Sequence, residues 1–334
     1  MTRSLIAFAL GVCTFASPAF SQNTLKVSKT FHIASDGGWD YLAVNGEKLY
    51  VSHGTQVNIL NKNNGDSIGV IENTTGVHGI AFVPSFNKGY TSNGRLNNVT
   101  VFDLKTNKIL GQIATGQNPD AIMYDNFSKT IITCNGRSND LTFIDPVKGE
   151  VTHTVAVGGK PETAVSDEAG KVFVNIEDKN EIVEIDTKTF KVENRWSIAP
   201  AEGPTGLAID TKTHRLFVGC EKLLAVVDAT TGKLVAKVPI GDGCDGVAFD
   251  PETKNVYTSN GEGTMTVVHE NGANAFKVTE TVKTKPRART IAIDETTHKL
   301  YLPTADFEPL SATAVKNERP KMVPGTFQVL VIDK

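Results

Sequence analysis

The sequence lacks two features that would define its class at once. Beyond the first 21 residues it has no apolar run approaching the roughly 20 residues that a membrane-spanning helix needs. It also lacks an excess of positive charge, because 34 Lys and Arg against 37 Asp and Glu give a formal net charge of −3. A nucleic-acid surface needs a basic stripe that displaces phosphate counterions. We therefore expect no transmembrane segment in the mature chain and no nucleic-acid partner.

Short catalytic motifs are missing too. The chain has no nucleophile elbow between a strand and a helix, no His-Glu-x-x-His pair and no Cys-x-x-Cys-His haem attachment. Gly-rich turns do not precede helices, so phosphate-binding and dinucleotide-binding loops are absent as well. What the chain has in quantity is glycine, at 29 residues, which is typical of many tight turns.

The N-terminus has the pattern of a secretory signal. Arg3 precedes an apolar run over residues 5–15, and Ala19-Phe20-Ser21 offers the small residues that a signal peptidase reads. We predict a signal peptide over residues 1–21, cut between Ser21 and Gln22. The mature chain, residues 22–334, is then a single domain that is periplasmic or secreted.

Cysteine is scarce, and only three cysteines follow the predicted signal: Cys134, Cys220 and Cys244. An exported compartment permits disulfides, but an odd number leaves at least one thiol unpaired. One interpretation is three buried, inert cysteines. The other is a disulfide between Cys220 and Cys244, which we expect on adjacent repeats, with free thiols or soft-metal ligands as further alternatives.

The chain repeats seven times at intervals of about 38 to 44 residues. Each unit contains short runs rich in Val, Ile and Thr, which suit a packed pleated surface. The first strands are expected to begin near Asp40, His78, Asp120, Glu162, Thr205, Asp245 and Arg289. Seven units of four short strands predict an all-β fold, a seven-bladed β-propeller of four-stranded blades.

Two local patterns support this prediction. An Asp ends most third strands (Asp103, Asp145, Asp186 and Asp228), where its carboxylate is expected to accept backbone N–H groups of the next turn. The seventh unit has no fourth strand, whereas residues 25–33 read like one. We therefore predict that this N-terminal strand completes the last blade and leaves no sheet edge free, which favours a monomer.

The repeat resembles a known family. Tyr90-Thr91-Ser92-Asn93, Tyr257-Thr258-Ser259-Asn260 and Leu49-Tyr50-Val51-Ser52, with Asp228-Ala229-Thr230-Thr231-Gly232-Lys233 after a third strand, resemble the YVTN β-propeller repeat. The resemblance covers residues 25–334, and with the signal it extends to the YncE-like exported proteins. It implies a binding scaffold and no defined reaction.

In a propeller, first-strand starts and second-strand ends meet at one mouth of the central channel. We expect a ligand-binding site there, made of Asp40, His78, Asp120, Glu162, Asp245, Arg289, Asn93, Asn135 and Asn260. Carboxylates at close range need a neutralising partner. Carboxylate and amide oxygens suit calcium, whereas His53 and His78 with Asp40 or Asp120 suit zinc or copper. The predicted metal ligands are Asp40, Asp120, Glu162, Asp245, His53 and His78; the alternative is a solvated channel without metal.

One connection is longer than its counterparts. Residues 305–326, with Pro309, Pro320, Pro324 and Gly325, join a second strand to a third on the expected mouth side. Long connections in compact domains are often functional. Phe307 or Met322 could make this one a lid over the mouth; the alternative is a tolerated surface insertion.

Two function classes follow. The first is a non-catalytic scaffold that binds a small ligand, a metal or a protein partner at the mouth. The second is a divalent-metal-dependent hydrolase of lactones or esters, because Pro204-Thr205-Gly206-Leu207-Ala208 and Asp245-Gly246-Val247-Ala248-Phe249 resemble strand starts of gluconolactonase-type propellers. That resemblance implies an Asp at 245, but Thr205 replaces the expected Asn and Asp40 the expected Glu.

Overall fold

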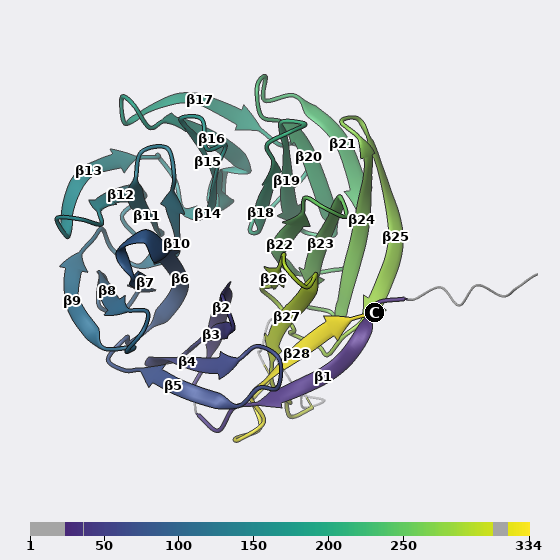
Figure 1. The fold of residues 1–334 in the computed structure, drawn as a ribbon. Helices are drawn as coiled ribbons and strands as arrows, with labels where there is room; N and C mark the ends of the chain where they lie inside the picture. Colours follow the sequence, from purple (N-terminus) through teal and green to yellow (C-terminus); the bar gives the residue numbers. More distant parts are fainter. Residues whose placement is uncertain (1–23, 36, 310–319) are drawn as a thin grey trace, which may run out of the picture.

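A computed structural model describes residues 24–35, 37–309 and 320–334. The predicted signal peptide, residues 1–21, lies outside the described residues, as do residues 310–319 of the long connection. The described chain forms seven four-stranded antiparallel sheets arranged as blades of a ring (Figure 1). The predicted all-β, seven-bladed propeller is confirmed.

Blades 1 to 4 follow the chain in order. Blade 1 contains β2 (Trp39–Asn45), β3 (Lys48–His53), β4 (Gln56–Asn61) and β5 (Ser67–Ile71). Blade 2 contains β6 (Val77–Val83), β7 (Lys88–Asn93), β8 (Asn98–Asp103) and β9 (Ile109–Ala114), with the 3-10 turn η1 (Pro84–Phe86). Blade 3 contains β10 (Pro119–Asp125), β11 (Thr130–Asn135), β12 (Asp140–Asp145) and β13 (Glu150–Ala156). Blade 4 contains β14 (Pro161–Ser166), β15 (Lys171–Ile176), η2 (Glu177–Lys179), β16 (Glu181–Asp186) and β17 (Lys191–Ser197).

Blades 5 to 7 complete the ring. Blade 5 contains β18 (Leu207–Asp210), β19 (Arg215–Cys220), β20 (Leu223–Asp228) and β21 (Leu234–Pro239). Blade 6 contains β22 (Cys244–Asp250), β23 (Asn255–Asn260), β24 (Thr264–Gly272) and β25 (Ala275–Lys283). Blade 7 contains β26 (Ala292–Asp294), β27 (Lys299–Thr304), β28 (Gln328–Asp333) and β1 (Lys26–His32).

The N-terminal strand closes the ring as predicted. β1 pairs antiparallel with β28, from Lys26 opposite Asp333 to His32 opposite Gln328, and forms the outer strand of blade 7 (Figure 1). Phe31 of β1 is buried in the hydrophobic cluster between blades 7 and 1. The first and last described strands therefore share one sheet and one piece of core.

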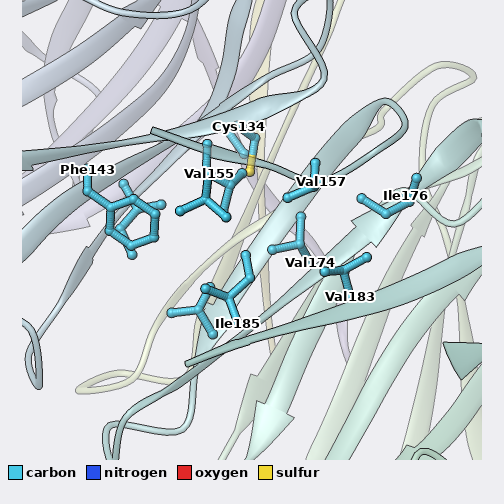
Figure 2. Close-up of a cluster of buried hydrophobic side chains, with 12 residues drawn as sticks. Cys134, Phe143, Val155, Val157, Val174, Ile176, Val183 and Ile185 are labelled. Carbon is cyan, nitrogen blue, oxygen red and sulfur yellow. The ribbon is translucent and has the colours of Figure 1, made fainter. Parts of the chain in front are cut away.

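The core lies between adjacent blades. Figure 2 shows one such cluster, in which Phe143 and Val155 of blade 3 pack against Val174, Val183 and Ile185 of blade 4. All five are at most 6% exposed. Full burial of one such side chain stabilises a fold by about 1.5–3 kcal/mol. Seven clusters of this kind hold the ring together.

The far face is the end of the ring where first and third strands end. There the predicted carboxylates accept hydrogen bonds from the backbone of the following turn, as expected. Asp103 accepts the backbone N–H groups of Lys105 and Thr106, and Asp228 accepts those of Thr230 and Thr231, at 2.7 to 3.0 Å. Asp145 and Asp186 bind their turns in the same way. These residues are structural.

Candidate functional site

The channel mouth is the opposite end of the ring, where the inner strands begin; we define it by Asp40, His78, Asp120, Glu162 and Asp245. Each of these residues lies at a break in strand register. The shifts fall between Trp39 and Leu42, Val77 and Ile80, Pro119 and Ile122, Pro161 and Ala164, and Cys244 and Gly246. A β-bulge re-aims the side chain that it carries. Five blades thus direct a polar side chain out of the regular ladder at the same level.

Hydrogen bonds between neighbouring blades fix the backbone at these bulges. The Ser92 hydroxyl donates to the Asp120 carbonyl and accepts from the Gly79 N–H at 2.8 Å. The Thr290 hydroxyl donates to the Asp40 carbonyl at 2.6 Å. A side chain at Gly79 would approach Ile122 to 2.8 Å, so glycine permits the close approach of β6 and β10. The mouth residues are therefore held on a rigid frame.

Three mouth residues from consecutive blades converge. Asp40, His78 and Asp120 start β2, β6 and β10, which contact one another in sequence around the axis. His78 Nδ1 lies 2.5 Å from Asp40 Oδ2 and 3.6 Å from Asp120 Oδ1. Their ligating atoms all lie within 4.8 Å of one another. The structure thus brings together three of the predicted site residues, and we call them the triad.

The triad holds more negative than positive charge. Burial acts to lower the pKa of His78, but the hydrogen bond that its Nδ1 donates to Asp40 and the charges of Asp120 and Asp40 outweigh it and raise that pKa to about 9. Burial and the charge of Asp40 raise the pKa of Asp120 well above its usual value. One imidazolium, that of His78, therefore neutralises part of the charge of two carboxylates, Asp40 and Asp120.

The predicted residues Glu162 and Asp245 have cationic partners of their own. Glu162 Oε2 lies 3.1 Å from Lys160 Nζ, which also contacts Glu177, and Asp245 Oδ2 lies 2.9 Å from Arg289 Nη1. Burial, opposed by Lys160, raises the pKa of Glu162 to about 7. Burial, opposed by Arg289, raises that of Asp245. Across the mouth, carboxylates still outnumber cationic groups.

Two mouth residues were not anticipated from the sequence. Lys160 was missed because it precedes the strand whose start we read as functional. Tyr41 was missed because it looks like an ordinary strand residue. Its hydroxyl lies 3.4 Å from the Thr163 hydroxyl, and burial with the charges of Asp120 and Asp40 raises its pKa well above the usual value. Alternation along β2 gave no signal, because the bulge at its start breaks the alternation.

The three predicted asparagines are placed differently from what we expected. Asn93, Asn135 and Asn260 are fully buried and turn into their own blades. Asn93 Nδ2 donates to Asn98 and Thr100 at 2.8 Å, and its Oδ1 accepts from Thr91. Asn135 and Asn260 repeat this network. These amides tie the second strand to the third and are occupied by structural bonds.

His53 is also placed away from the triad. Its ring is fully buried and stacks on Phe327 with centroids 3.8 Å apart. Its two nitrogens contact the Ser35 hydroxyl and the Gly37 carbonyl. A polar ring engaged on both nitrogens is a structural element of the joint between blades 7 and 1. It is not among the converging ligand groups of the described residues.

The predicted disulfide is not formed in this structure. Cys220 and Cys244 are buried free thiols, as is Cys134. Each of the first two points its sulfur at a carbonyl two residues away, that of Val218 at 3.6 Å and that of Gly246 at 3.7 Å. Burial raises the pKa of all three thiols. The interpretation as buried, unreactive cysteines fits this arrangement.

The described parts of the long connection lie beside the mouth. Phe307 and Met322 form an antiparallel bridge between its two arms. The Phe307 ring lies 6.0 Å from Trp39, the residue before Asp40. Both line a pocket that also includes Arg289. The base of the connection is therefore on the expected side; the predicted lid function remains a prediction.

Comparisons with known proteins show the fold. No family model matches the chain, and no curated protein does. Among solved structures, Kuenenia stuttgartiensis hydrazine synthase is 15% identical with a TM-score of 0.73, covering 81% of this chain and 94% of that one. A chain of the mitotic checkpoint complex is 12% identical with a TM-score of 0.73, covering 90% and 96%. Such likenesses establish a seven-bladed propeller and nothing finer. No helix among the described residues is long and apolar enough to cross a membrane.

Proposed function

We propose that this chain is an exported binding module that takes a small, positively charged ligand at the channel mouth. The observation that carries the proposal is the concentration of carboxylates there. Asp40, Asp120, Glu162 and Asp245 come from four blades, and their side chains are only 11–21% exposed. Like charges held in a partly desolvated site raise the free energy of the unliganded protein, and a bound cation relieves it.

The site is accessible as well as charged. The His78 side chain is 27% exposed and that of Asp40 21%, so a small ligand can reach the triad. The bulges and the hydrogen bonds between blades hold these groups in place before a ligand arrives. Preorganisation of this kind lowers the cost of binding.

The repeat pattern and the N-terminal signal support the other parts of the proposal. The Tyr-Thr-Ser-Asn units resemble the YVTN repeat of exported scaffolds, and residues 1–21 read as a cleavable signal. N-terminal sequencing of the mature protein tests export, with Gln22 as the expected first residue.

The hydrolase alternative has less support in the geometry. The residues that resemble gluconolactonase-type strand starts lie on neighbouring strands, but their polar groups are engaged in contacts within the protein. Asp245 is paired with Arg289, and the Thr205 hydroxyl donates to the Cys244 carbonyl at 2.7 Å. We therefore propose binding, in preference to hydrolysis, as the function of this mouth.

The test is a ligand screen by thermal unfolding. Organic polyamines, amino-acid amides and single divalent metal salts are added to the full mature protein and to two variants. Asp120→Asn removes a mouth carboxylate, and Glu252→Gln removes a far-face carboxylate that is 79% exposed. A ligand at a hundred times its Kd stabilises the fold by about 2.7 kcal/mol.

We expect at least one cation to raise the melting temperature of the wild type and of Glu252→Gln, with a clearly smaller shift for Asp120→Asn. Equal shifts in all three proteins would place binding elsewhere. No shift with any cation would refute the proposal.

A further inference from the structure

The triad differs from the rest of the mouth in combining an imidazole nitrogen with a buried carboxylate oxygen that has no hydrogen bond in the described part of the chain. Asp120 is 8% exposed, and its Oδ1 has no hydrogen-bond partner among the described residues. A buried carboxylate oxygen without a hydrogen bond is costly. This oxygen faces His78 Nδ1 at 3.6 Å, too far for a hydrogen bond but at the separation of two atoms that share a metal ion.

The separations of the ligating atoms suit a small ion. Bonds of about 2.0–2.2 Å to nitrogen and oxygen place neighbouring ligand atoms about 3–4 Å apart. The His78–Asp120 distance of 3.6 Å already falls in this range. The 2.5 Å contact between His78 and Asp40 is a hydrogen bond, and it must open by about 0.5–1 Å to admit an ion. The ion then takes the place of the proton between His78 Nδ1 and Asp40 Oδ2, and this proton is released to solvent.

The frame around the triad keeps its ligand atoms in place. The Asp40 N–H donates to the Ser52 hydroxyl at 3.0 Å, and its carbonyl accepts from Thr290. A side chain at Gly94 would come within 2.7 Å of His78 Nε2, so the imidazole packs against bare backbone on that side. Nδ1 is thereby directed to the two carboxylates. Metal sites are built in this way, with ligands oriented by a second layer of contacts.

We propose that Asp40, His78 and Asp120 form a centre for one divalent first-row transition-metal ion of the zinc type, with water in the remaining positions. This inference rests on the proposed function, because it names the cation that the mouth takes. Imidazole nitrogen with two carboxylate oxygens suits zinc, cobalt or copper, whereas calcium prefers an all-oxygen shell of six to eight ligands. Of the metals expected from the sequence, the triad therefore favours zinc or copper over calcium. Glu162 and Lys160 stay outside the first layer of ligands.

The experiment is titration calorimetry of the metal-free mature protein with Zn²⁺, Co²⁺ and Ca²⁺ separately, together with the visible absorption of the Co²⁺ form. The variants are Asp120→Asn and His78→Asn, with His153→Asn as the matched control on the exposed outer strand of blade 3. Urea unfolding verifies that each variant folds. A carboxamide or a lost imidazole removes one ligand without changing the frame.

We expect one Zn²⁺ or Co²⁺ per chain, bound at least 100-fold more tightly than Ca²⁺. Both triad variants should weaken binding at least 100-fold and change the Co²⁺ spectrum, while His153→Asn should change neither. Binding that survives in both triad variants would place the metal elsewhere and overturn the inference.

Other outcomes separate this inference from the proposed function. If polyamines bind at an Asp120-dependent site and Zn²⁺ and Co²⁺ do not, the mouth is a cation site and the metal centre is wrong. If Ca²⁺ binds as tightly as Zn²⁺, the imidazole is not a ligand and the inference also fails. If no cation binds, both proposals fall together.

Discussion

On the far face, Asp228 accepts the N–H groups of Thr230 and Thr231 and lies 2.8 Å from the guanidinium of Arg215. At the mouth, Asp120 has an oxygen without a hydrogen bond and shares its imidazole with Asp40. Partial burial acts to raise the pKa of Asp228, but the turn N–H groups and Arg215 lower it overall. Burial raises the pKa of Asp120. The far face thus stabilises the charged form of an aspartate, whereas the mouth destabilises it.

This difference separates the scaffold from the site. The far-face positions repeat from blade to blade, because in blades 1 to 6 the third strand must turn back into a fourth. The mouth positions differ between blades, and their carboxylates lack turn partners. Carboxylates that stabilise the fold and carboxylates that await a ligand can therefore be told apart by what happens when each is removed.

The largest effect is expected where the far face buries a complete ion pair. Lys62 and Asp294 are 5% and 4% exposed, and their charged atoms lie 2.8 Å apart. Asp294→Ala leaves the Lys62 ammonium buried with only Glu47, at 3.7 Å. We expect a loss of about 3–5 kcal/mol in the free energy of unfolding, measured with urea.

A double replacement, Lys62→Met with Asp294→Leu, is the control for this prediction. It removes both charges and fills the space, so most of the stability should return. A double variant as unstable as Asp294→Ala would mean that the hydrogen bonds of Asp294 to its turn, and not the stranded charge, account for the loss.

A smaller loss is expected at a turn carboxylate. Asp228→Ala removes the acceptor of two backbone N–H groups, while Arg215 keeps the carbonyls of Ala273 and Thr213 as partners. Urea unfolding should show a loss of about 1–3 kcal/mol. Asp228→Asn keeps an oxygen for the turn and should lose less; equal losses would assign the effect to charge alone.

At the mouth the same kind of change should cost little. Asp120→Asn removes the ion pair with His78 but also a buried anion whose Oδ1 has no hydrogen bond to any described residue, so the two effects offset each other. We expect a change below about 1 kcal/mol in either direction, by urea unfolding without added ligand. A loss of unfolding free energy as large as that of Asp294→Ala would show that Asp120 stabilises the fold, as the far-face carboxylates do.

The two ends of the blades should also differ in the pH dependence of stability. The pKa of Asp294 is lowered in the fold, because Lys62 and the turn outweigh burial, so its contribution is present above its usual value of 3.8 and lost on further acidification. Glu162 behaves in the opposite way: its pKa is raised from 4.5 to about 7, so its contribution is present below 4.5 and lost as pH rises to 7.

Glu162→Gln tests the second half of this contrast. The variant should show a shallower decline in unfolding free energy between pH 4.5 and 7, because Asp120 and Asp245 keep their raised pKa values, and it should keep the acid limb below pH 4. The charged groups that act on Glu162 are Lys160, Glu177 and Asp245, and none is altered by the substitution. An unchanged slope in that pH range would show that Glu162 is not the group responsible.

The fold could be predicted from the sequence because its signal is repeated. Seven units agree on strand period, and the carboxylate that ends most third strands accepts hydrogen bonds from backbone N–H groups within three residues of itself. Even the closure by β1 is visible, since the last unit lacks a strand that the N-terminus supplies.

The site could be predicted only in part. Asp40, His78 and Asp120 were placed together because strand starts meet at one end of a propeller. His53 and Asn93 end second strands at the same end of the ring, but their side chains turn into the protein and form hydrogen bonds there. The position of a residue in a repeat predicts where its backbone lies. The direction of its side chain depends on β-bulges and on residues of neighbouring blades, which the local sequence does not indicate.

The pairing of β1 with β28 has a consequence for how the chain is made. Ser28 bonds to the Val331 carbonyl across 303 positions of sequence. β1 is synthesised long before β28, and until β28 is made the edge of β1 is open to intermolecular pairing. Lys26 and Lys29 are exposed on this strand, and charged edge residues discourage association with other chains. The exposed lysines of β1 should therefore limit association with other chains until β28 pairs with β1 and closes the ring.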